Sequence, residues 1–186
     1  MKSAVIEDKK IIEKIKDEYR RRGWIRDLIL FVLSINTGAK LVNLLDLKVS
    51  DIKNKEFLKF KDVTNITRVF PLNAEIKIML QEFCNLRKNK EFLFSSKKDS
   101  SKAITRIEVF RKFKTVCEAI GVDGNYSVAS WRKTFGYHYY KQFGDILFLQ
   151  WLFGQTSPQE TLDYIGVQED LNSHFNKEFS LWKSYP

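Results

Sequence analysis

One apolar run in the first third of the chain restricts the folds open to it. Residues 25–36 read IRDLILFVLSIN, and this run is too apolar for a helix that lies on a surface. We therefore expect a helix buried in the core and ended at Gly38. Residues 41–47 begin another short helix, which places Lys40 at the junction of the two. A chain of 186 residues with 44% hydrophobic content can bury one such core and little more.

Helical periodicity recurs along most of the chain. A first helix, basic on its outer faces, is expected to begin at Asp8 and to end at Gly23. Further helices are predicted over residues 73–89, 105–120, 130–142, 145–153 and 158–164. Residues 49–73 instead shift toward a period of two, and LKVSDI, EFLKF and TRVFPLN indicate a small three-stranded antiparallel sheet. The expected fold class is α+β, mainly α.

The charge of the chain favours a polyanionic partner. It carries 32 Lys and Arg against 23 Asp and Glu, a net charge of +9, and most of the excess lies before residue 122. Such a surface binds nucleic acid by neutralising phosphates, although many basic proteins use the same charge only for solubility.

Other classes of protein have little support. Cys84 and Cys117 are the only cysteines, and we expect two buried thiols in a reducing compartment. No run approaches the roughly 20 apolar residues that a membrane span needs, and the N-terminus lacks the apolar region of a signal peptide. We expect a cytoplasmic protein with no membrane partner. No metal-ligand spacing or glycine-rich phosphate loop is present, so neither metal nor cofactor is expected.

Two segments carry a resemblance to a known family. RDLILFVLSINTGAKLVNLLDLKVSDI begins at Arg26, and WRKTFGYHYYKQFGDILFLQWLFGQTSPQETLDYIGV begins at Trp131. Together they resemble the two signature boxes of the tyrosine recombinases, the phage integrase family. The resemblance implies a single catalytic-type domain over residues 1–186. It also implies phosphoryl transfer, in which a tyrosine hydroxyl attacks a DNA phosphodiester.

The resemblance assigns roles to particular residues. Tyr164 in TLDYIG stands at the position of the nucleophile, and Arg132 in SWRKTFGYH at that of the second phosphate-binding Arg. The first Arg is replaced by Lys40 in NTGAK, which keeps the charge but loses the planar two-pronged grip of a guanidinium. The acidic residue expected soon afterwards is Asn43.

Other positions of the family's site carry residues with different chemistry. The His expected three residues before the second Arg is Ala129, which has no donor, and the later His or Trp is Gln155. The family's hairpin Lys should fall near Val63, where no donor exists. Lys61 or Arg68 would replace it if the turn has another register. Removing one positioned donor from such a site commonly costs about a hundredfold or more in rate, so we expect strand transfer to be impaired.

One helix resembles the element that this family lays against the DNA major groove. It begins AITRIEVFRKFK, and a solvated basic face is the alternative to a DNA contact there. This helix supplies four candidate DNA contacts, namely Thr105, Arg106, Arg111 and Lys112. Lys133, which directly follows Arg132, is a fifth candidate.

The ends of the chain lead to further expectations. Residues 1–24 supply a single basic helix and no N-terminal core-binding domain, while residues 168–186 form an amphipathic tail. The tail would either fold back onto its own core or pass to a neighbouring subunit. We expect a catalytically impaired DNA binder or regulator in a mobile-element context, with double-stranded DNA as partner. A homo-oligomer through the tail and another recombinase are further candidate partners. The alternatives are an active recombinase that uses Tyr164 and an interaction module without DNA affinity.

Overall fold

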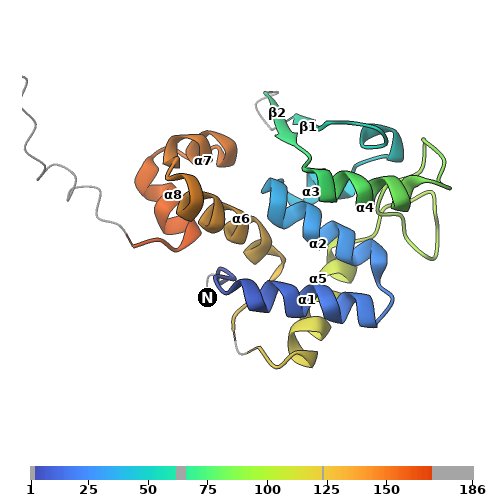
Figure 1. Cartoon of the computed structure of the whole chain (residues 1–186), viewed down its shortest axis with the longest axis horizontal. Coiled ribbons are helices and arrows are strands. Elements are labelled where there is room, and N and C mark those ends of the chain that lie inside the picture. The colour runs from blue at the N-terminus through green and yellow to red at the C-terminus, as the bar shows by residue number, and fades with distance from the viewer. Residues whose placement is uncertain (1–2, 62–65, 123, 169–186) are drawn as a thin grey trace, which may run out of the picture.

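The computed structural model describes residues 3–61, 66–122 and 124–168. It is mainly helical with one small antiparallel sheet (Figure 1), which confirms the predicted fold class. Its elements, in chain order, are α1 (Lys9–Arg21), α2 (Ile25–Thr37), α3 (Leu41–Leu45), the 3₁₀ turn η1 (Val49–Asp51), β1 (Phe57–Lys61), β2 (Thr67–Pro71), α4 (Ala74–Cys84), α5 (Arg106–Ala119), α6 (Val128–Phe143), α7 (Ile146–Phe153) and α8 (Pro158–Ile165).

Helix α2 is the buried core helix that its composition predicts. It packs against α1, α4 and α6, and Phe31 at its centre is fully buried. The Phe31 ring lies 5.4 Å from that of Trp131 in α6 and 6.2 Å from that of Phe113 in α5, centroid to centroid. The pair with Trp131 is edge to face and the pair with Phe113 is stacked, and aromatic pairs of either kind add about 0.5–1.5 kcal/mol beyond their burial. This cluster fixes α6 against α2, and α6 carries Arg132.

Gly38 ends α2 in a conformation that only glycine adopts without strain there. Its φ is +62°, and a Cβ at this position would lie 2.3 Å from Cδ1 of Phe135 in α6. The bend and the close approach both require the missing side chain. The chain therefore turns directly beneath α6, and Lys40 follows two residues later.

The sheet has two strands, so the prediction of three is wrong. β1 and β2 pair antiparallel, with Phe60 opposite Arg68. The segment expected as a further strand instead forms η1, where the Asp51 carboxylate accepts the backbone N–H of Lys48 at 2.7 Å. The same turn bonds to a segment remote in the sequence, with the Val49 N–H donating to Glu91 O at 2.9 Å. The apolar spacing of LKVSDI serves burial in this turn rather than pairing in the hairpin.

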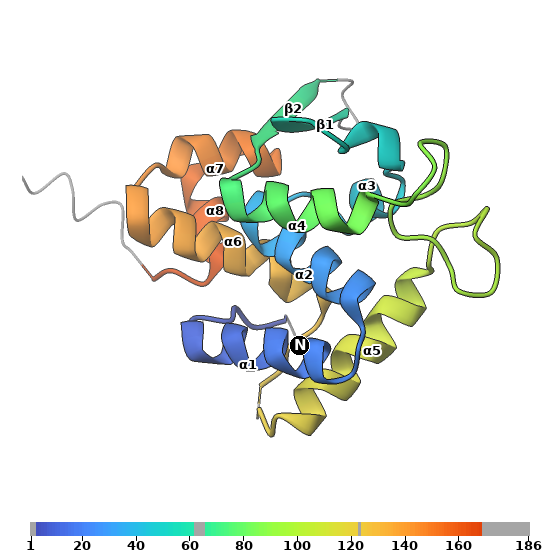
Figure 2. The ribbon, with the colours of Figure 1, turned by 45° about the vertical axis from the view of Figure 1, so that its right-hand side comes forward.

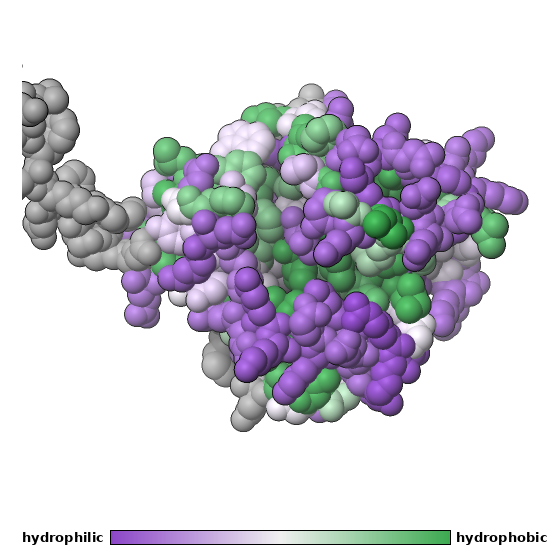
Figure 3. Space-filling view, viewed as in Figure 1, coloured by the Kyte–Doolittle hydropathy of each residue, from purple (hydrophilic) through white to green (hydrophobic). Residues whose placement is uncertain are grey.

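The helices gather in two groups that α2 and α6 join. α7 and α8 pack together beside α6, whereas α1 and α5 lie at the other side of α2 (Figure 1, Figure 2). The β-hairpin lies near α7 in both views. The outer face of α1 is strongly hydrophilic (Figure 3), as expected for the basic helix predicted over residues 1–24.

Candidate functional site

Arg132 is held at the centre of the site by backbone carbonyls. Its Nη1 donates to Gly38 O at 2.7 Å and its Nη2 to Leu152 O at 3.3 Å. The guanidinium carbon lies 4.5 Å from the centroid of the Phe153 ring. Burial lowers the pKa of Arg132, an effect that neighbouring Tyr164 opposes. The side chain is thus fixed in direction by the turn after α2 and by the end of α7.

Tyr164 lies on α8 and reaches the same region. The helix begins at Pro158 after Ser157, whose side chain accepts the Glu160 N–H. The Tyr164 ring meets Phe153 edge to face, with centroids 5.3 Å apart. Burial raises the pKa of the Tyr164 hydroxyl above its ordinary value, and the Arg132 guanidinium acts in the opposite direction. The hydroxyl is therefore neutral near pH 7.

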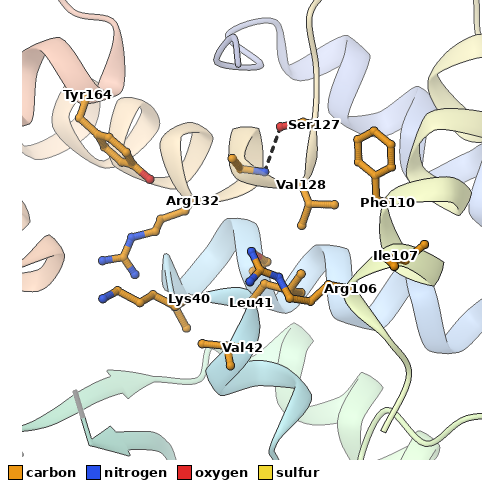
Figure 4. A pocket seen from close by; sticks show the side chains of 13 residues that line it. Lys40, Leu41, Val42, Arg106, Ile107, Phe110, Ser127, Val128, Arg132 and Tyr164 are labelled. Atoms are coloured by element: carbon orange, nitrogen blue, oxygen red, sulfur yellow. Dashed lines mark hydrogen bonds between the residues drawn. The ribbon is translucent and has the colours of Figure 1, made fainter. Parts of the chain in front are cut away.

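Lys40 lies beside Arg132. It precedes the first turn of α3 and is exposed, and its ammonium lies near the Arg132 guanidinium in the close view (Figure 4). Asn43 lies one turn further along α3 and lines the same small cavity as Lys40 and Arg132. The ammonium supplies charge at this position without a second guanidinium.

A third cation comes from the β-hairpin. Arg68 lies on the inward face of β2 and is 8% exposed. Its guanidinium carbon lies 4.0 Å from the centroid of the Trp151 ring, and its charge acts to lower the pKa of Arg132. Of the two hairpin residues that the sequence offers in place of Val63, the structure brings Arg68 to Arg132. Val63 itself lies outside the described residues.

These three cations surround a small cavity of about 130 Å³. Lys40, Arg68 and Arg132 line it together with Asn43 and apolar groups, and no carboxylate belongs to its lining as far as the structure describes the chain. Its volume corresponds to about four water molecules. A cavity with this lining suits a small anion such as a phosphate group, because each cation lowers the energy of negative charge placed between them.

A larger cavity of about 650 Å³ opens next to the small one. Lys40, Arg132 and Tyr164 line one part, and Arg106 and Phe110 from α5 line another (Figure 4). Ala129, at the position where the resemblance expects a His, also lines this cavity and leaves a methyl group there.

Gln155 lies apart from the cation-lined cavity. It follows α7 in the turn toward α8, and its Nε2 donates to Glu160 O at 3.2 Å. It lines a separate pocket with Lys133 and Tyr164. The role in place of His or Trp stays a prediction for Gln155. Its side chain lies next to Tyr164 and does not line the cavity of the three cations.

The predicted DNA contacts divide by position. Thr105 accepts the Glu108 N–H at 3.1 Å as the cap of α5, and Arg106 and Arg111 are exposed on that helix. Lys112 instead points inward, where its Nζ lies 2.8 Å from a carboxylate oxygen of buried Asp27. The structure therefore brings Arg106 to the larger cavity and places Lys112 in an internal ion pair.

Lys133 is also internal. It is 9% exposed, its Nζ donates to Ser3 O at 2.8 Å, and it lies 5.3 Å from the centroid of the Tyr164 ring. The segment before α1 crosses this face of α6, where the Ile6 N–H donates to Thr134 Oγ1 at 3.0 Å. A DNA contact by Lys133 stays a prediction, and its position favours a role in holding α6 and the N-terminal segment together.

Comparison with known proteins identifies the family. The model of the phage integrase family matches residues 7–170 of the chain. The chain belongs to the phage integrase family. It is 31% identical over 180 residues to a protein of Bacillus subtilis described as probable integrase/recombinase YoeC, covering 94% of this chain and 97% of that protein.

Solved integrase-family structures share the fold. XerA recombinase superposes with a TM-score of 0.73 at 18% identity, covering 96% of this chain and 66% of that chain. A lambda integrase tetramer bound to a Holliday junction gives a TM-score of 0.69 at 19% identity, covering 91% of this chain and 51% of that chain. The chain thus spans about half to two thirds of these recombinases.

The remaining chemistry of the described residues is limited. Residues 3–61, 66–122 and 124–168 contain no group of His, Cys, Asp and Glu placed to hold a metal ion, and none of their helices is long and apolar enough to cross a membrane. The imidazole of His138 lies 3.0 Å from Ile6 O and is held by the N-terminal segment. The site therefore combines a neutral tyrosine with three cations.

Proposed function

We propose that this chain binds duplex DNA through its phosphates, with a strand-transfer site that is impaired. One observation carries the proposal: Lys40, Arg68 and Arg132 line one small cavity beside the cavity that Tyr164 lines, while Ala129 takes the place of a proton donor. Such a site can hold a phosphate but lacks part of the chemistry needed to break its ester bond.

Binding follows from the charge and its arrangement. The net charge of +9 favours association with a polyanion. Exposed Arg106 and Arg111 on α5 supply cations beyond the buried site. Each phosphate that is neutralised contributes a slope of about −0.9 to the logarithm of the binding constant against the logarithm of salt concentration.

Impairment follows from the groups that surround the tyrosine. Attack on phosphorus requires the Tyr164 hydroxyl to lose its proton, yet burial raises its pKa. The leaving oxygen needs a proton donor, and Ala129 supplies none. Losing one positioned donor from such a site costs about 3–4 kcal/mol in the barrier.

An active recombinase is the second candidate, and one observation favours it. Arg68 adds a second guanidinium to that of Arg132, so the site retains two guanidinium groups although Lys40 replaces the first Arg. In this candidate, Tyr164 forms a phosphotyrosyl link and frees a 5′ hydroxyl.

The two candidates are separated by a covalent product. The full chain is titrated against random duplex DNA at several salt concentrations, and nicked suicide duplexes are then analysed on denaturing gels. We expect salt-dependent binding without an adduct. An adduct that Tyr164→Phe abolishes would overturn the impairment. Binding without a salt dependence would overturn the phosphate contacts and favour an interaction module.

The wider role is proposed on the same basis. A binder that does not cut would act in the cytoplasm as a regulator in a mobile-element context, alone or with another recombinase. An assembly of several copies would draw on the tail of residues 168–186, of which residues 169–186, including Phe175, Phe179 and Trp182, lie outside the described part of the chain.

A further inference from the structure

Three large apolar side chains project from the rim of the larger cavity. Ile107 is 62% exposed and Phe110 45% exposed on α5, and Val42 on α3 is 48% exposed. All three line the cavity that Arg132 and Tyr164 also line. The core face of α5 is made by other residues, namely Val109, Phe113, Val116 and Cys117. Packing within residues 3–61, 66–122 and 124–168 therefore does not account for this apolar rim, and gathered exposed apolar groups commonly mark a binding surface.

The charges around the rim specify the kind of partner. The cationic side chains of the cavity are Lys40, Arg106 and Arg132, and its lining contains no carboxylate within the described part of the chain (Figure 4). A surface that is both apolar and cationic matches a partner that carries anionic groups and small apolar groups close together. Duplex DNA is such a partner, because its major groove presents the C5 methyl group of thymine between two lines of phosphates.

We propose that Ile107 and Phe110 recognise thymine through its C5 methyl group and so give this protein a preference for A·T pairs. This inference rests on the proposed DNA binding. The two residues are three positions apart, which separates them by about 4.5 Å along the helix. Base pairs follow one another every 3.4 Å, so neighbouring pairs fall within reach of the two side chains. Arg106 and Arg111 flank them in sequence and supply phosphate contacts on the same helix.

The test changes the DNA by one methyl group per base. An alternating dA·dT duplex is compared with the same duplex in which deoxyuridine replaces thymidine, using the full chain and fluorescence anisotropy at fixed low salt. Uracil pairs as thymine does but lacks the methyl group. Burying one methyl group changes affinity by roughly fourfold, so we expect the thymine duplex to bind at least that much more tightly.

Two variants assign the preference to these residues. Ile107→Ala with Phe110→Ala should weaken binding to the thymine duplex, leave binding to the uracil duplex nearly unchanged and remove the preference. Leu86→Ala removes an apolar side chain that is 96% exposed outside the cavity lining, so it should retain the preference. Circular dichroism melts confirm that each variant is folded.

The outcomes separate the inference from the proposal beneath it. Equal affinity of the unaltered protein for the two duplexes would overturn thymine recognition and leave DNA binding intact. A preference that persists in the double variant would overturn the assignment to Ile107 and Phe110. Absence of salt-dependent binding to either duplex would overturn the proposed function itself. A preference lost only in the double variant would support the inference.

Discussion

Lys112 and Arg111 are adjacent cations on α5 for which the structure predicts opposite behaviour. The Lys112 ammonium lies 2.8 Å from a carboxylate oxygen of Asp27, whose side chain is 5% exposed. Arg26 also reaches Asp27, but its guanidinium lies further away, at 3.2 Å. Lys112→Met would leave a buried carboxylate with only that weaker partner, whereas Arg111 is exposed.

The cost of Lys112→Met follows from that geometry. Removing one partner of a buried ion pair costs about 3–5 kcal/mol. Lys112 retains 18% exposure and Arg26 remains, so we expect about 2 kcal/mol. With a urea m-value of about 2 kcal/mol/M, the unfolding midpoint should fall by about 1 M. Arg111→Ala should change stability by less than about 0.5 kcal/mol.

Two assays on the same variants test this reasoning. Urea unfolding followed by tryptophan fluorescence gives stability, and DNA titrations over a range of salt give the number of phosphate contacts. Arg111→Ala should reduce the salt slope by about one, while Lys112→Met should leave it unchanged. Adding Asp27→Asn to Lys112→Met should recover part of the lost stability, because the unpaired charge is gone. A reduced slope for Lys112→Met with an unchanged unfolding midpoint would refute the internal role.

Further predictions address packing, acid sensitivity and the thiols. Gly136→Ala places a Cβ 2.6 Å from Cγ2 of Ile165. This overlap outweighs the gain in helix propensity, so urea unfolding should show a free energy of unfolding lower by about 1 kcal/mol. An unchanged midpoint would contradict the tight contact between α6 and α8. Two arginines lower the pKa of Glu18 to about 2, so its stabilisation is present above pH 4.5 and is lost as pH falls toward 2. Thermal melts over that range should therefore decline less steeply for Glu18→Gln, and parallel declines would refute the pairing. Burial raises the pKa of the Cys84 thiol, and it raises the pKa of the Cys117 thiol to about 11. Both thiols should therefore resist a thiol reagent at pH 8 until the protein is unfolded. Rapid labelling of the native protein would contradict this.

Local patterns predict the helical part of this fold because the signals for it are local. The apolar composition of residues 25–36 is enough to bury α2, and Gly38 ends it by a preference that depends on one residue. The side chains of Thr105 and Ser157 cap α5 and α8 at the positions where the sequence begins those helices. The period-two pattern likewise predicts the hairpin β1–β2 and leaves Arg68 on its inward face.

The errors and omissions concern partners that are remote in the sequence. The segment around Val49 pairs with the backbone of Glu91, so its alternation indicated a strand where the chain forms a turn. Lys112 pairs with Asp27, which lies 85 positions earlier in the chain, and Lys133 donates to Ser3 O, 130 positions earlier. A charge counted as a surface cation from sequence becomes an internal donor once such a partner is in place. These pairings depend on tertiary packing, which residue type and spacing do not encode.

The proton balance of the site supports the proposal that this chain holds DNA without cutting it. Strand transfer must remove a proton from the Tyr164 hydroxyl and deliver one to the leaving oxygen. Arg68 and Arg132 hold their protons too tightly to act as acids, so Lys40 is the cation in the lining of these cavities that could deliver one, and our proposal places it on a phosphate instead. The side chain of Ala129 has no exchangeable proton, and the imidazole of His138 is held at Ile6 O by the N-terminal segment. Interactions that favour the bound phosphate and its transition state equally strengthen binding without accelerating the reaction. Under the proposed function, a site of this composition contributes its charge to affinity for DNA.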